Sequence, residues 1–86
     1  MKLDLNKGPR LNLLGCRPGD WVRIVSIDAG AGAALNLSRL GLSPGDQVQV
    51  LRRSPLAGPI VVRLGESEIA IGRGLAERVL VERAPA

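Results

Sequence analysis

LGLSPGDQVQV, residues 40–50, closely repeats an earlier stretch of the same chain, LGCRPGDWVRI, residues 14–24. Both contain Gly-x-x-Pro-Gly-Asp-x-Val. Proline presets φ at the second position of a tight turn, and glycine accepts the positive φ that the third position of a type II turn requires. The predicted turns are centred on Pro18-Gly19 and on Pro44-Gly45. Because solenoids generally need at least three repeats, the pattern indicates one turn used twice to begin two strands.

Apolar and polar residues alternate after the second turn, where Val48 and Val50 alternate with Gln47 and Gln49. Alternation of this kind is typical of a strand with one buried face. The same reasoning predicts five strands: Trp21–Ile27, Gln47–Arg53, Pro59–Leu64, Glu68–Arg73 and Arg78–Glu82. We interpret Leu11–Leu14 as a short first strand or a turn.

The segment GAGAALNLSRLGL, residues 30–42, predicts one helix. Its apolar residues, Leu37 and Leu40 among them, recur at intervals of three and four residues, which places them on one helical face. Gly41 can supply the positive φ found just past a helix end, and Leu42 is placed to pack back on Leu37 in a Schellman-type stop.

Five or six short strands with one inserted helix predict a mainly β fold, because closing a small sheet into a barrel removes its exposed edges. We expect an SH3-like barrel. An OB-like barrel is the alternative.

The composition predicts one globular domain, residues 1–86, since 45% of the 86 residues are hydrophobic. Twelve Lys and Arg residues against eight Asp and Glu residues give a net charge of +4. A scattered positive charge suits an acidic protein surface, a phosphate-bearing partner or solubility. Nucleic acid is not an expected partner, because Trp21 is the only aromatic residue and cannot alone form a stacking platform.

The N-terminal residues contain no apolar stretch long enough for a signal peptide or a membrane span. We therefore expect a cytoplasmic protein that does not insert into a membrane.

Enzymatic and metal-dependent functions are disfavoured by the residues that the chain lacks. It has no histidine, which is the commonest general base and metal ligand, and only one cysteine, Cys16. One thiol cannot form an internal disulfide or a closed zinc or iron site within one protomer. We predict no catalytic residue, metal site or cofactor, and a structural role for Cys16. Asp20 and Asp46, at equivalent turn positions, are expected to bond local backbone amides.

The predicted helix and its end are rich in leucine. There are more leucines here than one short helix needs to cover one side of a small barrel: Leu35, Leu37, Leu40 and Leu42. Two interpretations stay open: the helix is well buried, or part of it is an anchor for another protein.

Four segments in their order resemble the FeoA family, small proteins of the bacterial ferrous iron transport system. The segments are RPGDWVRIVSI, RLGLSPGDQVQVLRRSPLAGPIVV, EIAIGRGLA and ERVLV, which together run from Arg17 to Val81. The second of them is the most specific. Arg52 and Arg53 match the basic strand end of the family, and Arg73 with Ala76 matches its closing motif. Ala33, Ala34, Leu35 and Asn36 stand where the family usually has helical arginines.

The resemblance implies an SH3-like barrel with a helix, no enzymatic activity, and a partner. That partner is the FeoB permease, whose cytosolic part carries a G-protein domain. The expected partner-binding residues are Leu37, Arg39, Leu40, Leu42, Arg52 and Arg53. The structural turn residues are Pro18, Gly19, Gly41, Pro44 and Gly45. Self-association into a homo-oligomer stays open.

A second interpretation is an SH3-like interaction module in another iron-related or regulatory complex, because the same barrel resembles the C-terminal domain of iron-dependent repressors. A repressor needs an attached DNA-binding domain, for which 86 residues leave no room.

Overall fold

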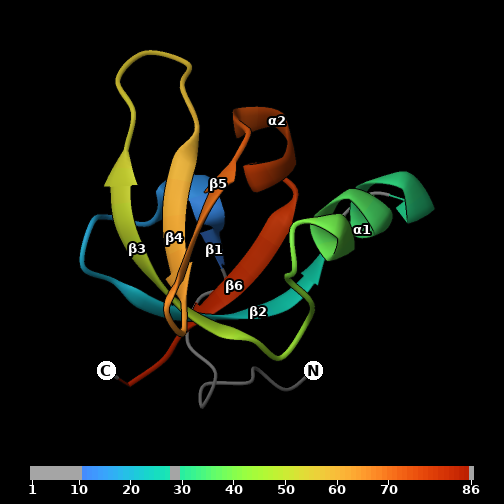
Figure 1. Cartoon of the computed structure of the whole chain (residues 1–86), viewed down its shortest axis with the longest axis horizontal. Coiled ribbons are helices and arrows are strands. Elements are labelled where there is room, and N and C mark those ends of the chain that lie inside the picture. The colour runs from blue at the N-terminus through green and yellow to red at the C-terminus, as the bar shows by residue number, and fades with distance from the viewer. Residues whose placement is uncertain (1–10, 28–29, 86) are drawn as a thin grey trace, which may run out of the picture.

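The computed structural model describes residues 11–27 and 30–85. In this part of the chain six antiparallel strands form one sheet, in the order β1-β6-β2-β3-β4-β5 (Figure 1). The strands are β1 (Leu11–Asn12), β2 (Trp21–Ile27), β3 (Gln47–Arg53), β4 (Ile60–Leu64), β5 (Ser67–Ile71) and β6 (Val79–Arg83). The helices are the 3-10 turn η1 (Leu13–Gly15), α1 (Gly30–Arg39) and α2 (Arg73–Ala76).

The predicted mainly β class is confirmed, but the sheet does not close into a barrel. β1 and β5 are the two ends of the hydrogen-bonded order. Within residues 11–27 and 30–85, β1 pairs with β6 through Leu11 and Asn12 before the chain turns into η1, and β1 and β5 do not pair with each other. Figure 1 shows the sheet strongly bent, with β3 and β4 running across the direction of β2 and β6.

Both predicted Pro-Gly turns are confirmed. Gly19 has a φ of 95° and Gly45 a φ of 99°. In the first turn the Asp20 amide donates to the Arg17 carbonyl at 3.0 Å, and the second turn repeats this bond at 3.1 Å. These are the positive φ and the four-residue bond that a type II turn requires.

The two copies of the repeat also pair with each other. Val22 and Val48, which are equivalent positions of the two copies, face each other in the antiparallel β2–β3 ladder. The Gly19 amide donates to the Val50 carbonyl at 2.7 Å. Its counterpart, the amide of Gly45, donates to the carbonyl of Ile24 at 2.7 Å. Each turn therefore bonds to the middle of the other copy's strand, and these reciprocal bonds relate the two copies by a local two-fold axis.

Helix α1 ends in the predicted Schellman stop. Gly41 has a φ of 94°. Its amide donates to the Ser38 carbonyl at 2.9 Å, and the Leu42 amide donates to the Leu37 carbonyl at 3.1 Å. This is the bond pair that defines the motif.

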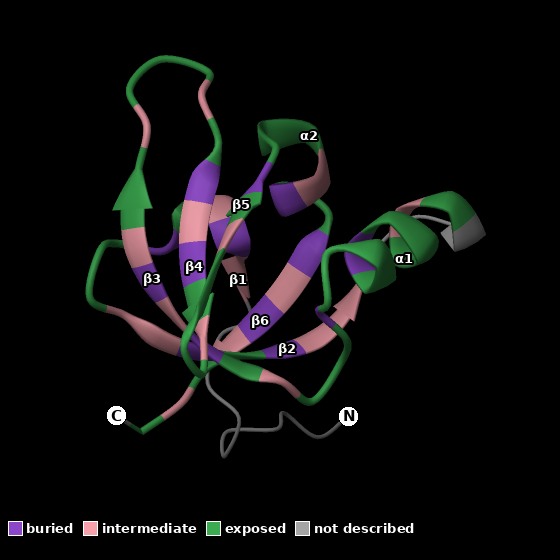
Figure 2. Ribbon diagram, viewed as in Figure 1, coloured by how far each residue is buried: buried purple, intermediate pink, exposed green. Residues whose placement is uncertain are grey.

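The core lies on the concave face of the bent sheet and is purely apolar among the described residues (Figure 2). Alternate residues of β2, β3, β4 and β6 supply it, as expected from their period-two pattern. The fully buried residues include Val22, Ile24, Leu37, Leu42, Val48, Val50, Ile60, Val62, Ile71, Val79 and Val81.

The predicted strand Glu68–Arg73 extends too far. β5 ends at Ile71, and Arg73 begins the four-residue helix α2, which was not predicted. A single helical turn is too short to show a periodicity. Ala76 at its end is fully buried, so the core holds this turn in place. Leu11–Leu14 is shared between β1 and η1.

Candidate interaction surface

The helical part of the predicted partner surface is smaller than expected. Leu37 is 0% exposed and Leu42 1% exposed, so both belong to the core. Their assignment to the partner surface is therefore corrected: the Schellman stop turns both side chains inward. Leu40, which is 38% exposed, and the exposed Arg39 remain available at the end of α1.

Arg52 and Arg53 lie at the end of β3 and are both exposed. Arg52 donates to the Glu68 carboxylate of β5 at 3.1 Å, and Arg63 of β4 lies 3.6 Å from the same carboxylate. Arg53 forms no ion pair within residues 11–27 and 30–85. The guanidinium groups of Arg52 and Arg63 thus share one carboxylate, and Arg53 adds a further positive charge at the end of β3.

The structure does not bring the two halves of the predicted surface together. Figure 1 shows α1 on one side of the molecule and the upper end of β3 on the other. Arg39 and Leu40 are thus separated from Arg52 and Arg53. A partner that contacts one pair needs a large footprint to contact the other.

The loop between β3 and β4 carries a surface residue that the sequence analysis missed. Leu56 is 95% exposed, against 51% for Leu35 and 38% for Leu40. Its position in SPLAGP, between two prolines, was a signal that a loop would hold it. The pattern of alternation assigns no environment to a loop residue, so its exposure could not be predicted from the sequence.

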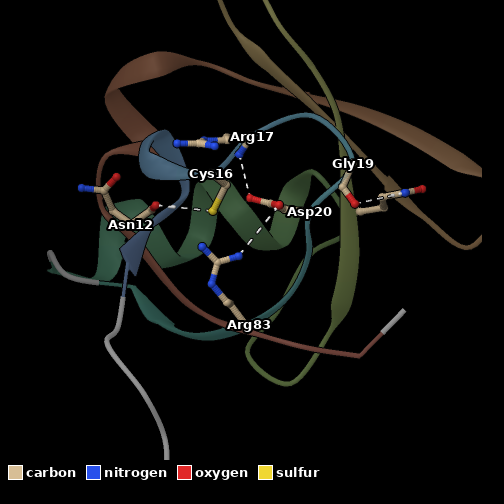
Figure 3. Close-up of polar contacts among 7 residues, drawn as sticks. Asn12, Cys16, Arg17, Gly19, Asp20 and Arg83 are labelled. Atoms are coloured by element: carbon tan, nitrogen blue, oxygen red, sulfur yellow. Dashed lines mark hydrogen bonds and ion pairs between the residues drawn. The ribbon is translucent and has the colours of Figure 1, made fainter.

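Cys16 has the predicted structural role (Figure 3). It is 0% exposed, and its thiol donates to the Asn12 carbonyl at 3.7 Å. Burial raises the pKa of the Cys16 thiol above its ordinary value of 9.0, and the negative charge of Asp20 raises it further. The thiol therefore stays protonated, and a protonated thiol is a poor nucleophile and metal ligand.

The turn carboxylates bond local backbone, as predicted. Asp20 accepts from the Arg17 amide at 2.8 Å and lies 3.9 Å from the Arg83 guanidinium (Figure 3). Asp46 accepts from the Ser43 amide at 2.9 Å. Within the described residues, no three His, Cys, Asp or Glu side chains are grouped as metal ligands. No helix there is long and apolar enough to cross a membrane.

Comparisons with known proteins agree on one family. The FeoA domain profile matches residues 11–83. A protein of Methanocaldococcus jannaschii named "Putative Fe(2+) transport protein A" is 40% identical over 68 residues, which cover 79% of this chain and 80% of that protein.

Solved structures give the same result. The crystal structure of an iron uptake regulatory protein, FeoA, superposes with a TM-score of 0.79 at 38% identity, covering 88% of this chain and 99% of the other. A manganese-dependent transcriptional repressor superposes with a TM-score of 0.79 at 26% identity, but only 42% of its chain is covered. The SH3-like fold is thus shared with part of a longer protein, whereas the first match is nearly complete in both directions. The chain belongs to the FeoA family.

Proposed function

We propose that this protein is a non-enzymatic, cytoplasmic accessory protein of ferrous iron transport, which docks on the cytosolic G-protein region of the FeoB permease. The observation that carries the proposal is the match to the FeoA domain over residues 11–83. The name of the M. jannaschii relative, an Fe(2+) transport protein, supports the same system.

The surface that we assign to docking is the exposed basic end of β3, with Arg52 and Arg53. Charged groups at the rim of an interface steer association and fix its orientation more than they add affinity. The net charge of +4 favours encounter with an acidic partner surface. Arg39 and Leu40 are a second, separate contact in this proposal.

Calorimetric titration of the protein into the purified G-protein region of its own permease tests the proposal. The titration is carried out with and without a non-hydrolysable GTP analogue. We expect saturable binding, and a difference between the two states would make the protein a nucleotide-sensitive regulator. No binding in either state would contradict docking on this region.

A second candidate function is an interaction module in another metal-regulatory complex. The match to part of a manganese-dependent repressor favours it. An unbiased pull-down with the tagged full chain separates the two, since recovery of the permease supports the first and recovery of a regulator without the permease supports the second.

A further inference from the structure

Leu56, at the tip of the β3–β4 hairpin, is the most exposed large apolar residue of the described chain, at 95%. The loop that carries it rises clear of the sheet in Figure 1 and is exposed along most of its length in Figure 2. We propose that Leu56 is an anchor that inserts into an apolar pocket, rimmed by carboxylates, on the protein partner. This inference rests on the proposed function and assigns the part of the domain that enters the permease.

The backbone at Leu56 is strained. Its φ is 61°, and it is the only non-glycine residue with a positive φ in residues 11–27 and 30–85. Conformations of this kind cost free energy in residues with a Cβ and persist only where the surrounding structure imposes them. Glycine would suit the position better for folding. An exposed leucine there stabilises neither the core nor the turn, so its use lies outside the folded chain.

The loop holds Leu56 in one place. The Ser54 amide donates to the Pro59 carbonyl at 3.0 Å, and the Gly58 amide donates to the Pro55 carbonyl at 3.3 Å. A Cβ added at Gly58 would clash with the Cβ of Ser54, so the loop closes tightly on itself. The two prolines further restrict its backbone. A side chain presented in a preorganised loop loses little conformational entropy on binding, which favours a role as a binding anchor.

The charges around the loop indicate the chemistry of the pocket. Residues 54–59 carry no charge, whereas Arg52 and Arg53 immediately precede them at the end of β3. Both arginines are exposed, and Arg52 pairs with the Glu68 carboxylate, while Arg53 has no ion pair among the described residues. An exposed leucine beside exposed arginines is complementary to an apolar pocket whose rim carries carboxylates.

A membrane surface and a second copy of the chain fit less well. A single leucine buries far less apolar area than a myristoyl chain, and one myristoyl chain alone gives only marginal membrane binding. In a second copy, the other large exposed apolar residues within residues 11–27 and 30–85 are Leu35, in α1, and Leu40, just beyond it. Arg39 is the only charged residue of α1, so the helix itself offers a positive charge and no carboxylate to a basic hairpin.

Leu56→Gly tests the anchor, because glycine accepts the positive φ and the variant should therefore fold with an unchanged or higher melting temperature. Leu56→Met keeps an apolar side chain, and Leu35→Ala removes an exposed leucine elsewhere. In titrations into the permease G-protein region, we expect Leu56→Gly to weaken affinity about 10- to 100-fold. Leu56→Met and Leu35→Ala should stay within about threefold of wild type.

Each outcome distinguishes the anchor from the docking proposal. If wild type binds and Leu56→Gly binds equally well, the anchor is wrong and the docking proposal stands. If wild type does not bind, the docking proposal fails and the assignment of this partner to Leu56 fails with it. Sedimentation of wild type and Leu56→Gly, alone and with anionic phospholipid vesicles, tests the two other partners, a second copy of the chain and a membrane surface. Dimerisation or vesicle binding that depends on Leu56 would contradict the proposal that Leu56 enters a pocket on the protein partner.

Discussion

Gly19 and Gly45 show how single backbone conformations begin the strands of this protein. At both positions φ is near +95°, and nothing lies within 4 Å of the place a Cβ would occupy. The constraint is therefore conformational and not one of space. Because glycine adopts a φ near +95° at little cost, whereas residues with a Cβ do so rarely, these positions could be predicted from the sequence.

Gly45→Val should lower the free energy of unfolding by about 1–3 kcal/mol, since a β-branched residue resists a positive φ. Gly72→Val is the matched control: Gly72 has a φ of −59° and a ψ of 150°, with no atom near its Cβ position. Urea denaturation of both variants measures the difference. Equal stability of Gly45→Val and wild type would contradict the assigned turn.

Cys16 should make the stability of the protein depend on pH in the alkaline range. Its folded-state pKa is raised above the ordinary value of 9.0, mainly by burial. Below 9.0 the thiol is protonated in both states and its contribution is fully present. As pH rises above 9.0, the thiol of the unfolded state loses its proton before the thiol of the folded state does. The free energy of unfolding therefore falls until the pH has passed the folded-state pKa.

The measurement is urea denaturation between about pH 7 and pH 10.5, with Cys16→Ala as the reference. The variant loses stability at every pH because it leaves a cavity. At high pH the free energy of unfolding of wild type should fall relative to that of Cys16→Ala, and this fall reports the ionisation of the thiol. A constant difference across the range would show that Cys16 does not titrate on unfolding.

Helix α1 is held mainly through its C-terminal end. Leu37 is the only fully buried residue of α1 in the part whose burial is described, residues 32–39. It packs with Leu42 just beyond the helix. The Schellman stop thus both ends the helix and fixes it to the sheet.

Leu37→Ala should cost about 2–5 kcal/mol of stability, because it removes a fully buried leucine. Leu35→Ala, the same substitution on the same helix at a residue that is 51% exposed, should stay within about 0.5 kcal/mol of wild type. Thermal or urea denaturation compares them. Similar losses in the two variants would mean that α1 packs through a different face.

The strands and the helix were predictable because each has a local signal: a turn residue, a period of two, or a positive-φ stop. The end of β5 and helix α2 were not. Nothing in EIAIGRGLA distinguishes a strand that continues from one that turns at Gly72. Helix α2 contacts η1, which lies far from it in the sequence, and this tertiary contact favours the turn at Gly72.

Three exposed arginines, Arg52, Arg53 and Arg63, lie on the β3–β4 side of the molecule, whereas helix α1 on the other side carries one charged residue, Arg39. Reversing both charges in Arg52→Glu/Arg53→Glu should weaken binding to the permease region about tenfold, with the melting temperature nearly unchanged. Arg73→Glu/Arg78→Glu, which reverses two exposed arginines of α2 and the following turn, is the control. Full binding by the first variant would move the interface away from β3.

Ferrous iron should not bind stoichiometrically to the isolated protein. Cys16 is buried and protonated, and the chain has no histidine. Anaerobic titration with ferrous iron at micromolar protein is expected to show no saturable isotherm. A one-to-one isotherm would show that the protein supplies ligands for iron, and it would contradict the structural role assigned to Cys16.

The candidate surface was only partly predictable. Arg52 and Arg53 at a strand end are exposed, as a docking role requires, whereas Leu37 and Leu42 proved to be core. Apolar residues at helical spacing look the same in sequence whether they are covered by the chain or by a partner.

Local chemistry accounts for the turns, the strands, the helix stop and the mainly β class, because proline and glycine restrict φ within a few residues of themselves. The tertiary structure alone decided which leucines are covered, that the two repeat copies pair across a local two-fold axis, and that the sheet stays open. It also decided that Leu56 projects into solvent. These features depend on contacts between residues distant in the chain, whose pairing no local preference specifies.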